Sequence, residues 1–208
     1  YEAAVATELK KEKTFFIPFN QGSNGAGRVG GAGNPQREDG GFVTAYLWEE
    51  VLRRDTLLAI LQRYIMRQEE EKLSLIIDKH GKEKEVKETS VKIIFPRYHQ
   101  LDVVEKLVDD TMRNGSGHNY LIQHSAGSGK SNSIAWLTYR LASLHDAEQK
   151  HIFNSVFVIT DRRVLNKQLR ETILSFDHID GQIEWITDND NSSKLRDIIN
   201  DDNTRIVI

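Results

Sequence analysis

The first half of the chain alternates between short apolar segments and long polar ones. An apolar run at residues 14–20 is followed at 21–41 by a stretch rich in Gly, Asn and Ser, which is typical of an irregular loop. Two apolar stripes at helical spacing then predict two short helices that meet at Asp55, the expected N-cap of a helix over 56–66. Residues 67–88 are rich in Glu and Lys around a small apolar centre. They predict a solvated connector with a short strand or hairpin, a turn at Lys79–Lys82 and a domain boundary near residue 90.

The second half alternates between apolar runs of strand length and segments with helical periodicity. Strands are expected at residues 120–124, 156–160, 183–187 and 205–208. Helices are expected at residues 101–112, 130–144, 162–175 and 193–199, the last one capped from Ser192. This alternation favours an α/β fold in which helices cover both faces of a parallel sheet.

Composition narrows the class of protein only slightly. Hydrophobic residues make up 38% and charged residues 28% of the 208 positions, and no apolar run approaches the roughly 18 residues of a membrane span. The absence of cysteine excludes disulfides and thiolate metal sites, and we expect a cytoplasmic protein. With a formal net charge of −3, any surface that binds nucleic acid must be a local basic patch.

A glycine-rich turn links the first expected strand to the helix that follows it. Its sequence is Ala126-Gly127-Ser128-Gly129-Lys130-Ser131, which resembles the phosphate-binding P-loop, although His124 stands where the full pattern has Gly or Ala. In such a loop the backbone amides and the helix N-terminus bind phosphates, Lys130 reaches the β and γ phosphates, and the Ser131 hydroxyl ligates Mg²⁺. The alternative is an incidental Gly-Ser turn before a helix. The sequence therefore predicts an ATP and Mg²⁺ site at residues 127–131, with Lys130 as the catalytic residue.

Two polar segments outside the loop are further candidates. Before the helix at 101–112, Gln100 has the paired donor and acceptor that read an adenine edge, and Arg97 or Tyr98 can stack on the base. The alternative is that these are ordinary surface residues at a helix start.

After the second expected strand, a helix carries a row of basic residues. Arg163, Lys167 and Arg170 fall on one helical face that can follow a DNA backbone, or that is merely solvated.

Four motifs in this order resemble the motor (R) subunit of type I restriction enzymes, the ATP-dependent DNA translocases of helicase superfamily 2. They are FIPFNQG with GAGNP, TAYLWEEVLRRDTLLAILQRYI, FPRYHQ, and QHSAGSGKS with the downstream VFVITDRRVLNKQL. A histidine at the first P-loop position is usual in that family. The resemblance implies three regions, namely the trailing edge of a nuclease domain with the Gly-rich loop at 1–42, a helical connector at 43–90, and an incomplete first RecA-like lobe at 91–208.

The same resemblance implies an activity and site residues. The parent subunit translocates duplex DNA with ATP and Mg²⁺, cleaves it, and assembles with methylation and specificity subunits. Nucleotide contacts are implied for Arg97, Gln100, Gly127, Ser128, Gly129, Lys130 and Ser131. DNA contacts are implied for Arg162, Arg163, Lys167, Gln168 and Arg170.

Two features limit what the 208 residues are expected to do. No acidic box of the DEAH type follows the P-loop, so we expect weak binding of Mg-ATP and negligible hydrolysis. Glu8 and Lys10 match the E-x-K spacing of restriction nucleases, but in the family that motif lies further upstream, and we interpret the pair as structural. The alternative functions are another superfamily 2 helicase, a type III restriction subunit, or a nucleotide-binding scaffold without motor activity.

Overall fold

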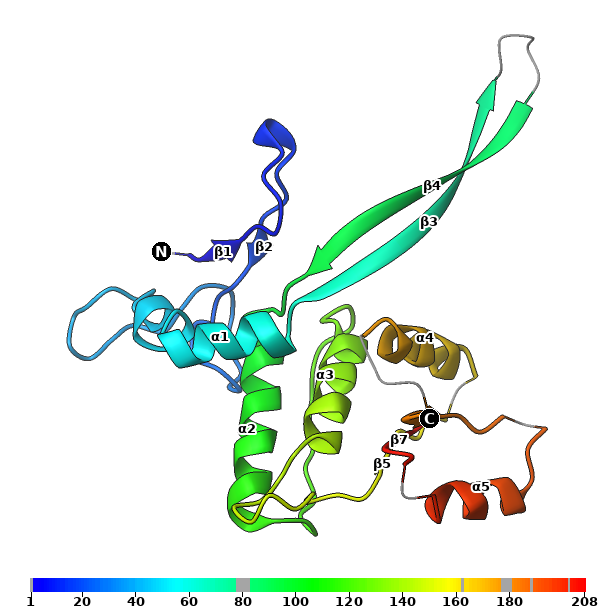
Figure 1. Cartoon of the computed structure of the whole chain (residues 1–208). Helices are drawn as coiled ribbons and strands as arrows, with labels where there is room; N and C mark the ends of the chain where they lie inside the picture. Colours follow the sequence, from blue (N-terminus) through cyan, green and yellow to red (C-terminus); the bar gives the residue numbers. More distant parts are fainter. Residues whose placement is uncertain (1, 78–82, 162, 177–180, 188, 202) are drawn as a thin grey trace.

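A long hairpin projects from a body built of helices and small sheets (Figure 1). The computed structural model describes residues 2–77, 83–161, 163–176, 181–187, 189–201 and 203–208. Strands β3 (Met66–Ile77) and β4 (Glu83–Ile94) form the hairpin and pair antiparallel from Met66 opposite Ile94 to Ile77 opposite Glu83. This confirms the expected hairpin, which is longer than predicted because its ladder continues through the charged flanks. The turn expected at Lys79–Lys82 lies outside the described residues.

The N-terminal segment folds back on itself before the chain enters the Gly-rich loop. Strand β1 (Ala4–Val5) pairs antiparallel with β2 (Ile17–Pro18), and the 3₁₀ turn η1 (Lys11–Lys13) lies between them. The structure has no helix or strand at 21–41, which confirms the predicted irregular loop.

Two short helical elements connect this loop to the hairpin. They are the π-helical turn η2 (Leu47–Val51) and helix α1 (Arg54–Arg63). The prediction of Asp55 as N-cap was wrong, because the N-cap is Arg53 and Asp55 lies in the first helical turn. There its carboxylate still favours the positive end of the helix dipole. The helix also stops before the predicted residue 66, since Tyr64 turns into the core and Met66 already belongs to β3.

The second half contains the expected helices and a parallel sheet. The helices are α2 (Tyr98–Asn114), α3 (Lys130–Ala142), α4 (Arg163–Leu174) and α5 (Ser192–Ile199). The sheet consists of β5 (Val156–Phe157), β6 (Ile183–Glu184) and β7 (Ile206–Val207) in the order β5-β7-β6. The strands are shorter than predicted, and α5 is capped by the side chain of Asn191 rather than from Ser192. This mixed α/β arrangement is compatible with the implied RecA-like lobe.

The strand predicted at residues 120–124 is absent. The segment pairs with no described strand, and Leu121 is 94% exposed, although an apolar run predicts burial. Local contacts hold it elsewhere, since the Tyr120 hydroxyl donates to Asp110 Oδ2 on α2 at 2.5 Å. Without a hydrogen-bonded neighbour an apolar segment does not become a strand, whatever its propensity.

Trp136 on α3 lies at the centre of the larger hydrophobic core. It is fully buried, and its Nε1 donates to the backbone oxygen of Tyr64 at 3.0 Å, which ties α3 to the junction of α1 and β3. Around it, Arg140 Nη1 donates to Glu105 Oε1 at 2.5 Å, and the Tyr64 hydroxyl donates to the same oxygen. Burial raises the pKa of the Tyr64 hydroxyl, so that it stays a neutral donor.

A smaller core cluster places the sheet against α3 and α4. It contains Ala135 and Ile173 from the helices and Ile183 and Ile206 from the strands. Within the described residues no helix is both long and apolar enough to cross a membrane.

Replacing Trp136 with Ala should lower the free energy of unfolding by about 3–5 kcal/mol, because it removes a buried indole and leaves the Tyr64 carbonyl unpaired. Urea unfolding followed by circular dichroism measures the change. Trp48→Ala is the matched control, since Trp48 is 52% exposed and should lose less than about 1 kcal/mol. Equal losses in the two variants would contradict this assignment of the core.

Candidate functional site

The glycines of the loop at 125–131 adopt a conformation that other residues disfavour. Gly127 has a φ of 73° and Gly129, the N-cap of α3, has a φ of 81°. A Cβ atom at Gly129 would also lie 2.5 Å from Gln100 Nε2, whereas one at Gly127 would meet nothing within 4 Å. Gly129 is therefore required by both its backbone and its neighbour, and Gly127 by its backbone alone.

Several backbone amides of this loop are free to bind a ligand. In the described part of the chain, the N–H groups of Gly127, Gly129, Lys130 and Ser131 donate no hydrogen bond. They surround the start of α3, where the helix dipole adds partial positive charge. Unpaired donors at a helix N-terminus are the arrangement that binds phosphate groups.

Two side chains at the start of α2 hold the carbonyl groups of the same loop. Gln100 Nε2 donates to the Gly129 oxygen at 2.8 Å, and His99 Nε2 lies 3.0 Å from the Ser128 oxygen. The C=O and the following N–H of a trans peptide point in opposite directions. Anchoring these carbonyls on α2 therefore turns the amides of Gly129 and Lys130 away from α2.

Both the oxygen and the nitrogen of the Gln100 side-chain amide form hydrogen bonds. Its Oε1 accepts from the backbone N–H of Arg97 at 2.8 Å, which caps α2, while its Nε2 holds the loop. The residue is only 3% exposed. Gln100 therefore fastens the loop to the helix start.

Lys130 and His124 complete the polar contacts of the loop. Lys130 Nζ donates to the backbone oxygens of Ser125 at 2.7 Å and His124 at 3.2 Å. The His124 ring meets the His99 ring edge-on, with centroids 5.0 Å apart, and its buried Nδ1 has no partner among the described residues. Burial, and then the nearby His99 and Lys130, lower the pKa of His124, so its ring is neutral at neutral pH.

A cavity of about 370 Å³ opens beside the loop. Three parts of the chain line it, at residues 7–17, 92–100 and 127–132. The charged side chains of the lining are four basic ones and one acidic one. The basic residues are Lys10, Lys13, Lys92 and Arg97, and the acidic residue is Glu8. The cavity is therefore electropositive and lies within the size range of small-molecule sites, roughly 300–1,000 Å³.

The structure brings most of the predicted nucleotide residues together. Arg97, Gln100 and residues 127–129 line the cavity, and Lys130 and Ser131 follow directly at the first turn of α3. Tyr98 is not available to a base, because its ring is buried against Phe19 and Tyr46.

Sequence reasoning missed two parts of this site. It assigned no role to His99, although His99 neighbours Gln100, and it assigned residues 1–42 to the edge of a nuclease domain without a role at the loop. Glu8 and Lys10, interpreted as structural, form an exposed ion pair at 2.7 Å on the cavity wall. The only signal for His99 was its position next to Gln100, whereas nothing local signals that residues 7–17 meet residues 127–132.

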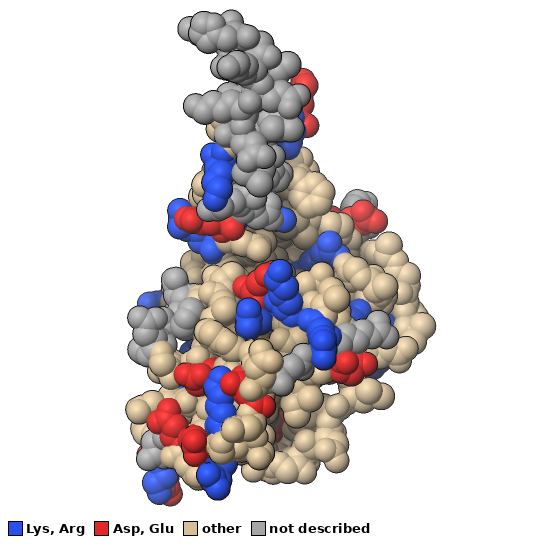
Figure 2. All heavy atoms as spheres, turned by 90° about the vertical axis from the view of Figure 1, so that its right-hand side faces the viewer, with Lys and Arg blue, Asp and Glu red and all other residues tan. Residues whose placement is uncertain are grey.

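Not all the side chains of the expected DNA-binding row on α4 are exposed. Lys167 projects into solvent with Glu171 as a distant partner at 3.9 Å, and Arg163 and Gln168 are also exposed. Arg170 instead lies over the Trp185 ring, with its guanidinium carbon 5.3 Å from the centroid. Arg162 lies outside the described residues. Basic and acidic side chains are interspersed on the face that carries α4 and α5 (Figure 2).

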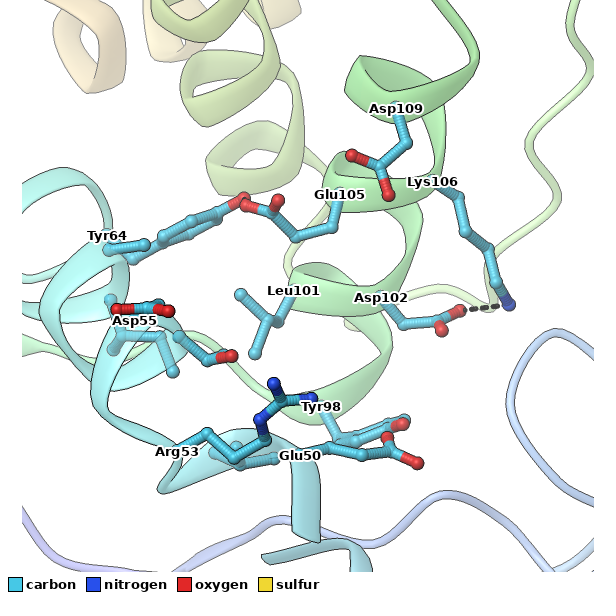
Figure 3. A pocket seen from close by; sticks show the side chains of 14 residues that line it. Glu50, Arg53, Asp55, Tyr64, Tyr98, Leu101, Asp102, Glu105, Lys106 and Asp109 are labelled. Carbon is cyan, nitrogen blue, oxygen red and sulfur yellow. Dashed lines mark hydrogen bonds and ion pairs between the residues drawn. The ribbon is translucent and has the colours of Figure 1, made fainter. Parts of the chain in front are cut away.

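A second cavity, of about 450 Å³, lies between α1 and α2 and contains none of the predicted site residues except Tyr98 (Figure 3). Two of its carboxylates are already paired, Asp102 with Lys106 at 2.8 Å and Glu105 with Tyr64 and Arg140. The described residues also contain no cluster of three or more His, Cys, Asp or Glu suited to hold a metal. The loop at 125–131 is therefore the strongest candidate site.

Comparison with known proteins agrees with this choice. Neither a curated protein nor a solved structure matches the chain significantly. A family model described as SWI2/SNF2 ATPase matches residues 99–208, which is more than half of the chain. The match begins at the two residues that hold the loop and includes the loop, α3 and the parallel sheet. The chain therefore belongs to the SWI2/SNF2 ATPases, helicase-like ATP-hydrolysing enzymes of superfamily 2.

Proposed function

We propose that this chain is part of the motor subunit of a type I restriction enzyme, and that its loop at 125–131 binds the ATP that drives DNA translocation. In this proposal residues 1–42 border the nuclease domain, residues 43–90 are the connector, and residues 91–208 form most of the first motor lobe. Membership of the SWI2/SNF2 ATPases supports the ATP-dependent, helicase-like activity. The four motifs FIPFNQG, YLWEEVLRRD, FPRYHQ and QHSAGSGKS, in that order, support the restriction subunit in particular.

The unpaired amides at the start of α3 are the observation that carries the proposal. Four N–H groups that have no acceptor among the described residues lie beside an electropositive cavity and suit the phosphate oxygens of a nucleoside triphosphate. Lys130 is already at the loop, where its Nζ donates to the carbonyl oxygens of His124 and Ser125, and it can exchange these for the β and γ phosphates.

The remaining residues of the loop have distinct roles in the proposed site. The Ser131 hydroxyl is placed to ligate Mg²⁺, which when bound neutralises charge on the phosphates. Gln100 and His99 keep the loop in its binding conformation, and Arg97 on the cavity wall is left to contact the base. Gln100 retains one amide hydrogen and one lone pair for an adenine edge, but its burial makes positioning its main role.

Duplex DNA and the other subunits are the proposed partners. On α4, Arg163, Lys167 and Gln168 are the exposed members of the row that would follow the DNA backbone, whereas Arg170 supports the helix by packing on Trp185. Methylation and specificity subunits would dock on parts of the full motor subunit.

Replacing Lys130 with Ala should weaken binding of Mg-ATP to the 208-residue chain by roughly 10- to 100-fold, because a charge-assisted hydrogen bond is worth about 1.5–3 kcal/mol. Calorimetric titration measures the affinity. Lys150→Ala is the control, since the Lys150 side chain is exposed, pairs with Glu148 at 2.8 Å and lies outside the cavity lining. Removing Mg²⁺ should weaken binding to the wild-type chain as well. If the Lys130 and Lys150 variants bind Mg-ATP equally, the loop is not the nucleotide site.

Replacing Lys167 with Ala should weaken binding of duplex DNA and lower the slope of log affinity against log salt by about 1, because one phosphate contact is lost. Fluorescence anisotropy of a labelled duplex over a series of salt concentrations measures both quantities. Arg196→Ala, at a side chain on α5 that is 72% exposed, should change neither.

Two outcomes would count against the DNA-binding role. If the wild-type chain binds no duplex, and DNA leaves its affinity for Mg-ATP unchanged, the chain is a nucleotide-binding scaffold rather than part of a motor. If the Lys167 and Arg196 variants lose the same affinity, the α4 face is not the DNA-binding surface.

A further inference from the structure

The N-terminal segment forms a wall of the cavity beside the phosphate-binding loop. Residues 7–17 are more than a hundred positions before Gly127, yet Thr7, Phe15 and Ile17 line the same cavity as residues 127–129. The β1–β2 pairing and η1 shape this segment, with the backbone oxygen of Ala3 accepting from the Phe19 N–H at 2.9 Å. A ligand bound at the loop therefore meets this wall.

Of two neighbouring aromatic residues on this segment, Phe15 lines the cavity and Phe16 does not. Phe15 is 74% exposed and lines the cavity, whereas Phe16 is 59% exposed and does not. An aromatic ring open to solvent at a cavity wall is a hydrophobic surface that a flat ligand group can cover. Phe15 therefore has both the exposure and the location to contact a ligand.

Most of the residues that the sequence predicted as contacts of the nucleotide base are not accessible to it. Tyr98 is buried in the core, and Gln100 is 3% exposed with both ends of its amide in use. Arg97 alone of the three is exposed on the cavity lining. A nucleotide whose phosphates lie at 127–131 therefore needs another surface to hold its base.

We propose that Phe15 stacks on the base of the nucleotide, so that the N-terminal segment completes the ATP site. The proposal rests on the function assigned above to the P-loop. Lys10, Lys13 and Lys92 on the same cavity wall make the surroundings of the ligand positive, which suits the charge of a nucleoside triphosphate. Stacking supplies affinity for the base that phosphate contacts cannot supply, and it links nucleotide binding to the segment that precedes the Gly-rich loop.

The test compares Phe15→Ala with Phe16→Ala in the 208-residue chain, titrated with Mg-ATP and with inorganic tripolyphosphate and Mg²⁺. Stacking of a base on an aromatic ring is worth enough that the Phe15 variant should bind Mg-ATP about tenfold or more weakly. Its affinity for tripolyphosphate should not change, because that ligand has no base. The Phe16 variant should bind both ligands like the wild type, and Phe15→Tyr should retain most of the affinity for Mg-ATP.

Each contrary outcome has a separate meaning. Equal affinity of the Phe15 and Phe16 variants for Mg-ATP would overturn the stacking role and leave the P-loop assignment intact. Loss of Mg-ATP and tripolyphosphate binding together in the Phe15 variant would also overturn it, since the effect would then act through the phosphate loop. Failure of the proposed function is recognised differently, by a wild-type chain that binds neither ligand or by a Lys130→Ala variant that binds tripolyphosphate normally.

Discussion

The side-chain amide of Gln100 joins two backbone groups on which the site depends. It accepts from the N–H of Arg97 at the start of α2 and donates to the carbonyl of Gly129 at the start of α3. The Gln100 side chain is only 3% exposed, so losing its partners would leave a buried amide unpaired at a cost of about 1–3 kcal/mol. The bridge also explains Gly129, since any side chain at that position would collide with the amide. Gln100 thus joins the loop to the start of α2 and, together with His99 on the Ser128 carbonyl, sets the direction of the loop amides.

This bridge acts within a packed frame that extends beyond the loop. Trp136 and Arg140, on the α3 helix that begins at the loop, contact Tyr64 at the junction of α1 and β3. Arg140 also pairs with Glu105 on α2, so α2 and α3 are joined near the loop by Gln100 and further along by an ion pair. The base of the β3–β4 hairpin is therefore connected to the helix that begins at the glycine-rich loop.

Patterns of neighbouring residues in the sequence predicted the helices and the glycine-rich loop, whose conformations depend mainly on local contacts. The P-loop followed from Gly127, Gly129 and Lys130 at fixed spacing before a helix, and the helices followed from apolar periodicity. Residues 120–124 show where this reasoning stops, because an apolar run becomes a strand only when a neighbour pairs with it. The caps at Arg53 and Asn191 differ from the predicted ones by one or two residues, which local sequence does not resolve.

The candidate site shows the same division between local and long-range contacts. Its glycine-rich loop before a helix could be predicted, because all the residues of that loop are consecutive. Its other wall could not, since Phe15 reaches the cavity only through the folding of a segment distant in sequence. The roles of His99 and Gln100 also depended on tertiary structure, which shows them holding loop carbonyls rather than facing a free ligand.

Hydrogen exchange with and without Mg-ATP tests whether ATP binds between the loop at 125–131 and the N-terminal segment. Mg-ATP should slow amide exchange at 127–131, where free N–H groups gain phosphate acceptors, and at 7–17, where the ligand covers the cavity wall. Exchange in α5, away from the cavity lining, should stay the same. Unchanged exchange at 127–131, or protection confined to another part of the chain, would show that ATP does not bind at this loop.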